Sequence, residues 1–296
     1  MTQLELNAIV ESSVAVPPGR RSRRRGGVRV LGIALGVITV AVALGPWLPF
    51  DPHTQVLDNA LQPPAWLNGG EWSHPLGTDK LGRDILARLL EGGRLSLLLA
   101  VGGVLGGLIP GVAMGLVAGY RGGRADGIVS RLAEAQLALP AVLVAIAIIS
   151  STGRSITVLL VVLSLLSWAQ YARIVRADAL AVRERPFVTA LRCAGVSELR
   201  IALRHVLPNV AGNIVVIATL EVGAMILAES GLSFLGLGVV SPDVSWGAML
   251  AEGRDQLRLA WWVAIFPGLA ITLVVLLVNL LGDALVESRD PRRGTS

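Results

Sequence analysis

The chain has 296 residues, of which 53% are hydrophobic and 16% are charged, and its formal net charge is +5. Soluble domains carry about 25% charged residues, so water is not the main solvent of this protein. The basic residues flank long apolar blocks instead of clustering with aromatic residues, which argues against a nucleic-acid binder. One cysteine and three scattered histidines predict neither an intrachain disulfide nor a metal centre. The only lysine, Lys80, does not stand in a Gly-Lys-Ser/Thr phosphate-binding loop, so any ATP must be bound by a partner.

The apolar blocks predict an all-α membrane protein with six transmembrane helices, because a bilayer core needs about 20 apolar residues per helix. The predicted spans are, in chain order, residues 28–49, 95–119, 133–151, 155–175, 207–229 and 260–282. The first window also fits a cleaved signal peptide, with Ala41-Val42-Ala43 as a small-residue cleavage pattern. Its apolar run continues to Leu48 and exceeds the usual core of about 7–15 residues, which favours an uncleaved helix.

Arginine and lysine residues are divided unequally between the two sides of these spans. The side of the N-terminal tail holds 19 of the 26. Positive residues are retained on the cytoplasmic side, so we expect both termini to be cytoplasmic. The resulting plan is a basic, disordered tail 1–27, a first helix 28–49, an external loop and surface helix 50–94, a helical core 95–285 with a cytoplasmic loop 176–206, and a C-terminal tail 286–296. A second external loop is expected at 230–259.

The second predicted span carries a glycine at every fourth position, which leaves one bare stripe along a helix: Gly103, Gly107, Gly111, Gly115 and Gly119. Helices approach closely along such stripes. We expect tight packing there, inside the chain or against a second membrane subunit, in preference to a gate.

The longest inside loop, residues 176–206, is predicted to be helical. Pro186 suits a helix start and Gly195 a helix stop. The residues between them give a short apolar face flanked by basic side chains: Phe187, Ala190, Leu191 and Ala194, with Arg185 and Arg192 beside them. Such a helix either caps the bundle or offers a plug to a soluble partner.

This loop resembles the coupling motif of ABC-importer permeases, Glu-Ala-Ala-x3-Gly-x9-Ile-x-Leu-Pro. Thr189-Ala190-Leu191 is followed by Gly195 and then by His205-Val206-Leu207-Pro208-Asn209, with the glycine and Leu-Pro spacings of the motif. Thr189 replaces the motif Glu, Leu191 replaces its second Ala, and His205 stands where many members have Ile. A His-x-Leu-Pro-Asn ending is usual in the peptide and nickel branch of that family.

Three further segments resemble the second permease subunit of the same branch, and the four together cover most of residues 74–291 in the expected order. The three are His74-Pro75-Leu76-Gly77-Thr78-Asp79-Lys80-Leu81-Gly82-Arg83-Asp84, Leu232-Ser233-Phe234-Leu235-Gly236-Leu237-Gly238 and Asn279-Leu280-Leu281-Gly282-Asp283.

The resemblance implies a five-helix permease core preceded by one extra helix, in a bacterial plasma membrane. It also implies a partner permease, two cytoplasmic ATPase subunits that bind ATP and Mg, and an external substrate-binding protein. Each ATPase would hold one coupling helix; the contact residues expected here are Phe187, Ala190, Leu191, Arg192 and Gly195, with His205, Leu207 and Pro208 ending the motif. Lipid surrounds the chain, and no cofactor, metal or nucleic acid is expected on it. Peptides are the favoured cargo, and nickel, glutathione or another small solute is the alternative; whether the two permeases are identical stays open.

Four residues are singled out for the membrane and the outer loops. Glu221 lies near the middle of the fifth span, where a carboxylate must face protein or water; it lines the pathway or bonds to a neighbouring helix. Phe234 and Trp246 are expected to anchor at the membrane interface or to line an outer gate. Glu229 lies near a span end, where we expect water to reach it.

Segment 74–84 is expected to form ordinary surface ion pairs, or else a docking surface for the binding protein. A secondary transporter driven by an ion gradient is a competing hypothesis, but it predicts repeated halves and paired ionisable residues near the midplane, where only Glu221 stands out. A membrane enzyme would need clustered His, Asp or Ser groups at one depth, and the sequence shows none.

Overall fold

The computed structural model describes residues 20–47 and 51–289. The predicted all-α fold is confirmed: the described part has no strand, and a single antiparallel bridge pairs Thr78 with Asp84. The helices are α2 (Arg20–Leu44), α3 (Ile85–Arg121), α4 (Gly123–Ala138), α5 (Ala141–Thr152), α6 (Ile156–Arg183), α7 (Pro186–Cys193), α8 (Glu198–Ile201), α9 (Leu207–Phe234), α10 (Trp246–Arg254) and α11 (Trp262–Arg289). Three short turns complete them: η1 (Gly45–Trp47), η2 (Leu57–Asn59) and the π-helical η3 (Ala202–Val206).

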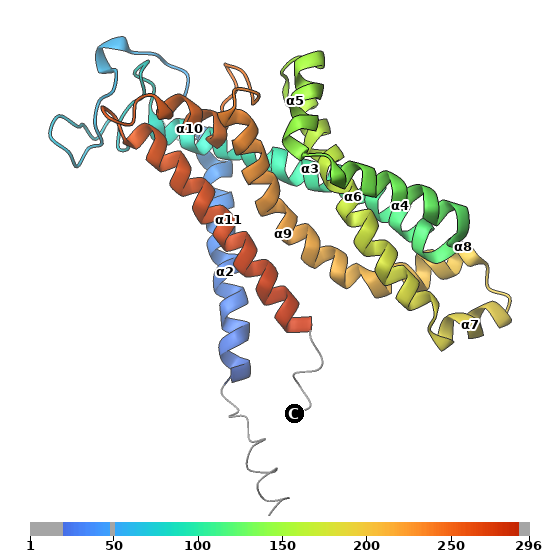
Figure 1. Cartoon of the computed structure of the whole chain (residues 1–296). Coiled ribbons are helices and arrows are strands. Elements are labelled where there is room, and N and C mark those ends of the chain that lie inside the picture. The colour runs from blue at the N-terminus through green and yellow to red at the C-terminus, as the bar shows by residue number, and fades with distance from the viewer. Residues whose placement is uncertain (1–19, 48–50, 290–296) are drawn as a thin grey trace, which may run out of the picture.

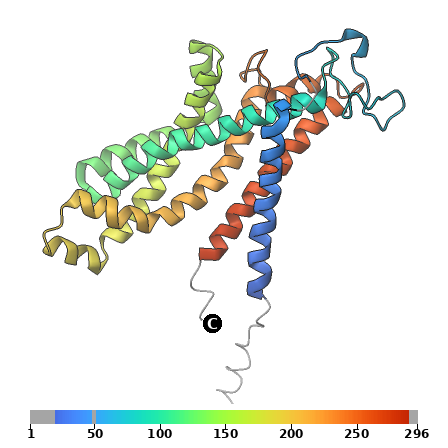
Figure 2. The same ribbon diagram turned by 180° about the vertical axis from the view of Figure 1, so that it is seen from behind.

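Helices α3 and α9 run between two ends of the molecule, as Figures 1 and 2 show. The α7 end carries α7 and α8, and the α10 end carries α10 and the irregular segment 51–84. Helix α2 begins, and α11 ends, on the side of the molecule that faces away from α10 (Figures 1 and 2). Residues 1–19 of the predicted tail lie outside the described residues.

Four helical stretches are long and apolar enough to cross a membrane: Ile85–Arg121, Ile156–Arg183, Glu198–Phe234 and Trp262–Glu287. The third of these includes α8, η3 and α9 as one continuous helix. Helices α4 and α5 pass the same test as a bent pair, and Val30–Leu44 of α2 is a shorter apolar helix. Each of the six predicted windows therefore contains helix among its described residues; residues 48 and 49 of the first window lie outside them.

The third predicted span, expected as one helix over 133–151, is instead bent by 88° between α4 and α5. Leu139 at the bend is extended, with φ −86° and ψ 134°. The cause is Pro140, because proline lacks an N–H and disfavours the helical conformation of the residue before it. Helix α5 consequently projects away from α4, as Figure 1 shows.

Helix boundaries extend beyond the predicted spans. Helix α2 begins at Arg20, inside the tail that was expected to be disordered. Helix α3 begins at Ile85, so the expected surface helix and the second span form one helix of 37 residues. Its start is fixed by Asp84, whose carboxylate accepts a hydrogen bond from the Ala87 N–H at 2.7 Å.

The glycine stripe of α3 packs inside the chain, against α6. A methyl group added at Gly111 would lie 2.5 Å from the carbonyl oxygen of Trp168, and one at Gly115 would lie 2.5 Å from that of Ala172. These distances are far below van der Waals contact, so only glycine permits this approach of the two helices. Of the two expected arrangements, the structure has the intrachain one.

Candidate functional site

Helix α7 is a short helix with well-defined ends at the α7 end of the molecule. Pro186 occupies its first turn, where a missing N–H costs nothing. Beyond its last residue, Gly195 adopts a positive φ of 75°. Two backbone hydrogen bonds close this end: the Gly195 N–H donates to the Arg192 carbonyl at 2.9 Å, and the Val196 N–H to the Leu191 carbonyl at 3.1 Å. The start and stop predicted at Pro186 and Gly195 are both present.

Two faces of α7 have different surroundings. Val188 is fully buried and Leu191 is half-buried; both join a cluster with residues of α3, α6, α8, η3 and α9, namely Tyr120, Val182, Ile201, Val206 and Val210. Phe187 and Ala190 are exposed, and Phe187 keeps 37% of its surface accessible. Sequence periodicity grouped Phe187, Ala190 and Leu191 on one face; in the structure Leu191, at the edge of that face, packs against the core cluster, whereas Phe187 and Ala190 are exposed.

Polar contacts also hold α7 in place. Arg192 of α7 pairs with Glu198 of α8, with 3.2 Å between Nε and Oε1, and its guanidinium lies 5.4 Å above the ring of Tyr120 of α3. The Tyr120 hydroxyl donates a hydrogen bond to the same Glu198 carboxylate. Arg192, predicted as a contact residue for a partner, is thus engaged within the chain.

The end of the sequence motif coincides with a π-helical segment. His205 belongs to η3, and Leu207 and Pro208 begin α9. Pro208 cannot donate a hydrogen bond to the preceding turn, and its ring crowds the carbonyl four residues earlier, which explains why the regular α-helical pattern fails there. The side-chain amide of Asn209 donates a further hydrogen bond within this segment, to the His205 carbonyl at 2.7 Å. The motif therefore marks the point where the short helices after α7 become one long helix.

Comparison with known proteins agrees with this arrangement. The family described as "Binding-protein-dependent transport system inner membrane component" matches residues 111–295, which include α7, η3 and the whole of α9. The chain belongs to this family.

Individual relatives resemble the permease over nearly its full length. A di/tripeptide transport system permease protein of Pseudomonas aeruginosa is 43% identical over 263 residues, covering 88% of this chain and 87% of the relative. A dipeptide transport system permease protein of Escherichia coli K12 is 39% identical, covering 99% of both chains. A glutathione transport system permease protein of Pectobacterium atrosepticum is 36% identical, covering 97% and 95%.

A buried charge cluster lies at the α10 end of the permease. Asp79 pairs with Arg83, with 2.7 Å between Oδ2 and Nε, and with Arg88. Both arginines also contact Glu252 of α10, at 3.1 Å and 2.9 Å. Burial opposes ionisation of Asp79, but the charge of Arg88 and hydrogen bonds from the N–H groups of Arg83 and Leu81 outweigh it, so the pKa of Asp79 lies below its ordinary value. This cluster ties segment 77–88 to α10.

Glu229 forms a second buried junction. It is fully buried and accepts hydrogen bonds from the hydroxyls of Ser233 at 2.7 Å, Ser245 at 2.8 Å and Ser96 at 3.5 Å. Ser96 in turn accepts from the Trp246 N–H at 3.0 Å. The expectation that water reaches Glu229 was wrong, because α3 and α10 close over the end of α9.

The candidate pathway residues lie apart from one another. Trp246 is 2% exposed and donates from Nε1 to the Leu89 carbonyl at 2.7 Å, so its indole packs inside the chain and leaves no free face for an interface anchor. Phe234 is 39% exposed, under the guanidinium of Arg254 at 5.3 Å. Glu221 is buried on α9 within electrostatic reach of Tyr171 of α6, whose hydroxyl has no hydrogen-bond partner among the described residues.

Proposed function

We propose that this permease is one of two membrane subunits of an ATP-driven importer of di- or oligopeptides. Support comes from the relatives, two of which are named as permeases for dipeptides or tripeptides and one for glutathione, itself a peptide. A second permease, two ATPase subunits that bind ATP and Mg, and an external binding protein complete the assembly on separate chains. Glu221, Phe234 and Trp246 are the candidates for the pathway or its outer gate.

The observation that carries the coupling role is the two-faced packing of α7. Phe187 and Ala190 offer an exposed apolar strip that fits a groove on a soluble partner. Val188 and the pairing of Arg192 with Glu198 bind the other face to α3, α6, α8 and α9. A displacement of α7 by the ATPase is therefore passed to the long helices, and ATP acts by favouring one of two states.

Orientation is tested with Cys193, the only cysteine, which is exposed on α7. We propose that the α7 end is cytoplasmic, so a membrane-impermeant maleimide should label Cys193 in inverted vesicles but not in intact cells. In a Cys193→Ala background, Ser73→Cys at the exposed α10 end is the matched control and should label from outside. Labelling of Cys193 in intact cells would overturn the orientation.

Coupling is tested by Ala190→Asp on the exposed strip of α7. We expect uptake to fall by at least tenfold while the amount of permease in the membrane is unchanged, because a buried unpaired carboxylate at an interface costs several kcal/mol. Ala181→Asp, at another exposed alanine, on α6 at the same end, is the control and should retain uptake. Normal uptake by Ala190→Asp, with the ATPase still co-purifying, would contradict the coupling role.

Cargo is tested by uptake of labelled dipeptide and, separately, of nickel, in cells with and without the gene and with ATP intact or depleted. We expect ATP-dependent dipeptide uptake to require the gene. Loss of nickel uptake alone would replace peptide with nickel as the cargo. Uptake that persists without ATP but needs an ion gradient would overturn the importer proposal.

A further inference from the structure

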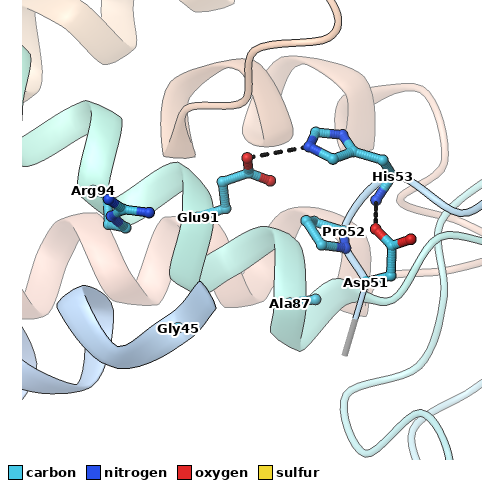
Figure 3. Close-up of a pocket in the computed structure, with 7 residues that line it drawn as sticks. All are labelled: Gly45, Asp51, Pro52, His53, Ala87, Glu91 and Arg94. Atoms are coloured by element: carbon cyan, nitrogen blue, oxygen red, sulfur yellow. Dashed lines mark hydrogen bonds and ion pairs between the residues drawn. The ribbon is translucent and has the colours of Figure 1, made fainter. Parts of the chain in front are cut away.

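A pocket of about 350 Å³ opens at the α10 end, where the end of α2 meets α3. Figure 3 shows its lining, which comes from the turn after α2, the following loop and one face of α3: Gly45, Asp51, Pro52, His53, Ala87, Glu91 and Arg94. None of these residues takes part in the α7 site or in the two buried junctions. The pocket is therefore a separate feature of the permease.

Charges of both signs line this pocket and are incompletely paired. Glu91 Oε1 lies 3.2 Å from His53 Nε2, while its Oε2 is buried without a hydrogen-bond partner. Hydrogen bonds from Thr54 and His53 lower the pKa of the Asp51 carboxyl, which keeps it ionised. Arg94 is exposed and forms no ion pair with another residue of the described ranges. The pocket thus offers acceptors for a cation and, one helical turn along α3, a donor for an anion.

The face of α3 that carries this pocket continues as an apolar stripe. Residues three and four apart share a helix face, and after Arg94 that face presents Leu98, Val101 and Leu105, which are 57%, 44% and 51% exposed. Trp47, two residues after Gly45, is 79% exposed at the same level. Exposed tryptophan at the end of an apolar helix is typical of the headgroup level of a bilayer.

We propose that the pocket binds the headgroup of a glycerophospholipid that bears a primary ammonium. Arg94 takes the phosphate, while the exposed carboxylate of Asp51 and the Oε1 atom of Glu91 accept hydrogen bonds from the ammonium. The acyl chains follow the stripe of Leu98, Val101 and Leu105. A free zwitterion such as a dipeptide carries the same two charges as the headgroup but has no acyl chains to contact this stripe. The apolar stripe therefore favours a lipid as the occupant.

The test uses the permease purified with its co-purifying subunits, delipidated in detergent and titrated by native mass spectrometry. Phosphatidylethanolamine is compared with phosphatidylcholine of the same acyl chains, whose quaternary ammonium has no N–H to donate. We expect the first to bind about tenfold more tightly, the effect of about one charged hydrogen bond. Because this comparison needs no substitution, it does not depend on the folding of a variant. Equal binding of the two lipids would overturn the proposal.

Two variants separate the roles of the charges. Glu91→Gln should abolish the preference between the two lipids, and Arg94→Gln should weaken both about tenfold. The controls are Glu71→Gln and Arg258→Gln, exposed residues at the same end that should leave binding unchanged. If the control variants lose as much lipid affinity, the effect reflects the overall charge of the protein, and the proposed site is refuted. Displacement of the lipid by Gly-Leu in wild type would make the pocket a peptide site and would also refute it.

Discussion

Replacing Asp79 with asparagine tests whether the buried charge cluster holds the α10 end together. Asp79 is 1% exposed and bridges Arg83 and Arg88. Removing one partner of a buried ion pair costs about 3–5 kcal/mol. Glu252 remains in contact with both arginines and is one-third exposed, so water and this carboxylate compensate in part. We therefore expect a loss of about 3 kcal/mol, at the lower end of that range.

Heating in detergent, followed by tryptophan fluorescence, measures this loss. Trp262 is a suitable reporter because its Nε1 donates to the Thr78 carbonyl at 3.1 Å, next to Asp79. A loss of about 3 kcal/mol should lower the midpoint by about 6–12 °C for a cooperative unit of this size. Glu252→Gln should cost only about 1 kcal/mol, because Asp79 still pairs with both arginines.

The exposed pair Arg254 and Asp255, at the same end, supplies the control. Asp255→Asn removes a carboxylate whose side chain is 70% exposed, and it should shift the midpoint by less than about 2 °C. The reasoning fails if Asp79→Asn has the same melting midpoint as this control. It also fails if Glu252→Gln lowers the midpoint more than Asp79→Asn does, because Asp79 would then not be the centre of the cluster.

Three further predictions concern single positions. Because the pKa of Asp79 is lowered in the folded state, its contribution to the free energy of unfolding should be constant from about pH 6 to 8 and lost as the pH falls below about 4. The melting midpoints of wild type and Asp79→Asn should therefore become equal at low pH. Gly111→Ala should destabilise the α3–α6 contact by at least about 2 kcal/mol, whereas Gly127→Ala, with open space around it, should be neutral or stabilising in melts. Gly195→Ala should cost about 1 kcal/mol through its positive φ and should speed maleimide labelling of Cys193 as the helix end loosens.

Local signals allowed much of the fold to be predicted from sequence. Apolar windows long enough to span a bilayer located the helices, and Pro186 and Gly195 located the ends of α7, because helix starts and stops depend on residues within one turn. Pro140 carries the bend between α4 and α5, but a proline signal gives neither the size nor the direction of a bend. The apolar window at 133–151 therefore predicted one straight helix where the structure has two.

The buried junctions at the α10 end could not be predicted, since they join distant parts of the chain. Arg83 and Glu252 are 169 residues apart, and Glu229 finds Ser96 133 residues earlier. Position along a span predicts depth in a bilayer, yet Glu229 is buried by neighbouring helices whose placement no local pattern encodes. Likewise the apolar face of α7 could be predicted from the sequence. The burial of Leu191 at the edge of that face could not, because it depends on the helices packed beneath α7.

Because helix α9 is long, a small tilt at one of its ends displaces the other end by a much larger distance. Its 28 residues extend about 42 Å from the π-helical segment to Phe234. If α9 tilts by about 10° about the π-helical segment, Phe234 moves by about 7 Å at this length. In the proposed importer, a small rearrangement at the α7 end would therefore become a displacement at the α10 end larger than the diameter of a water molecule. The displacement of the far end for a given tilt is proportional to helix length. Shortening α9 by two turns would therefore reduce it even with every contact at α7 intact.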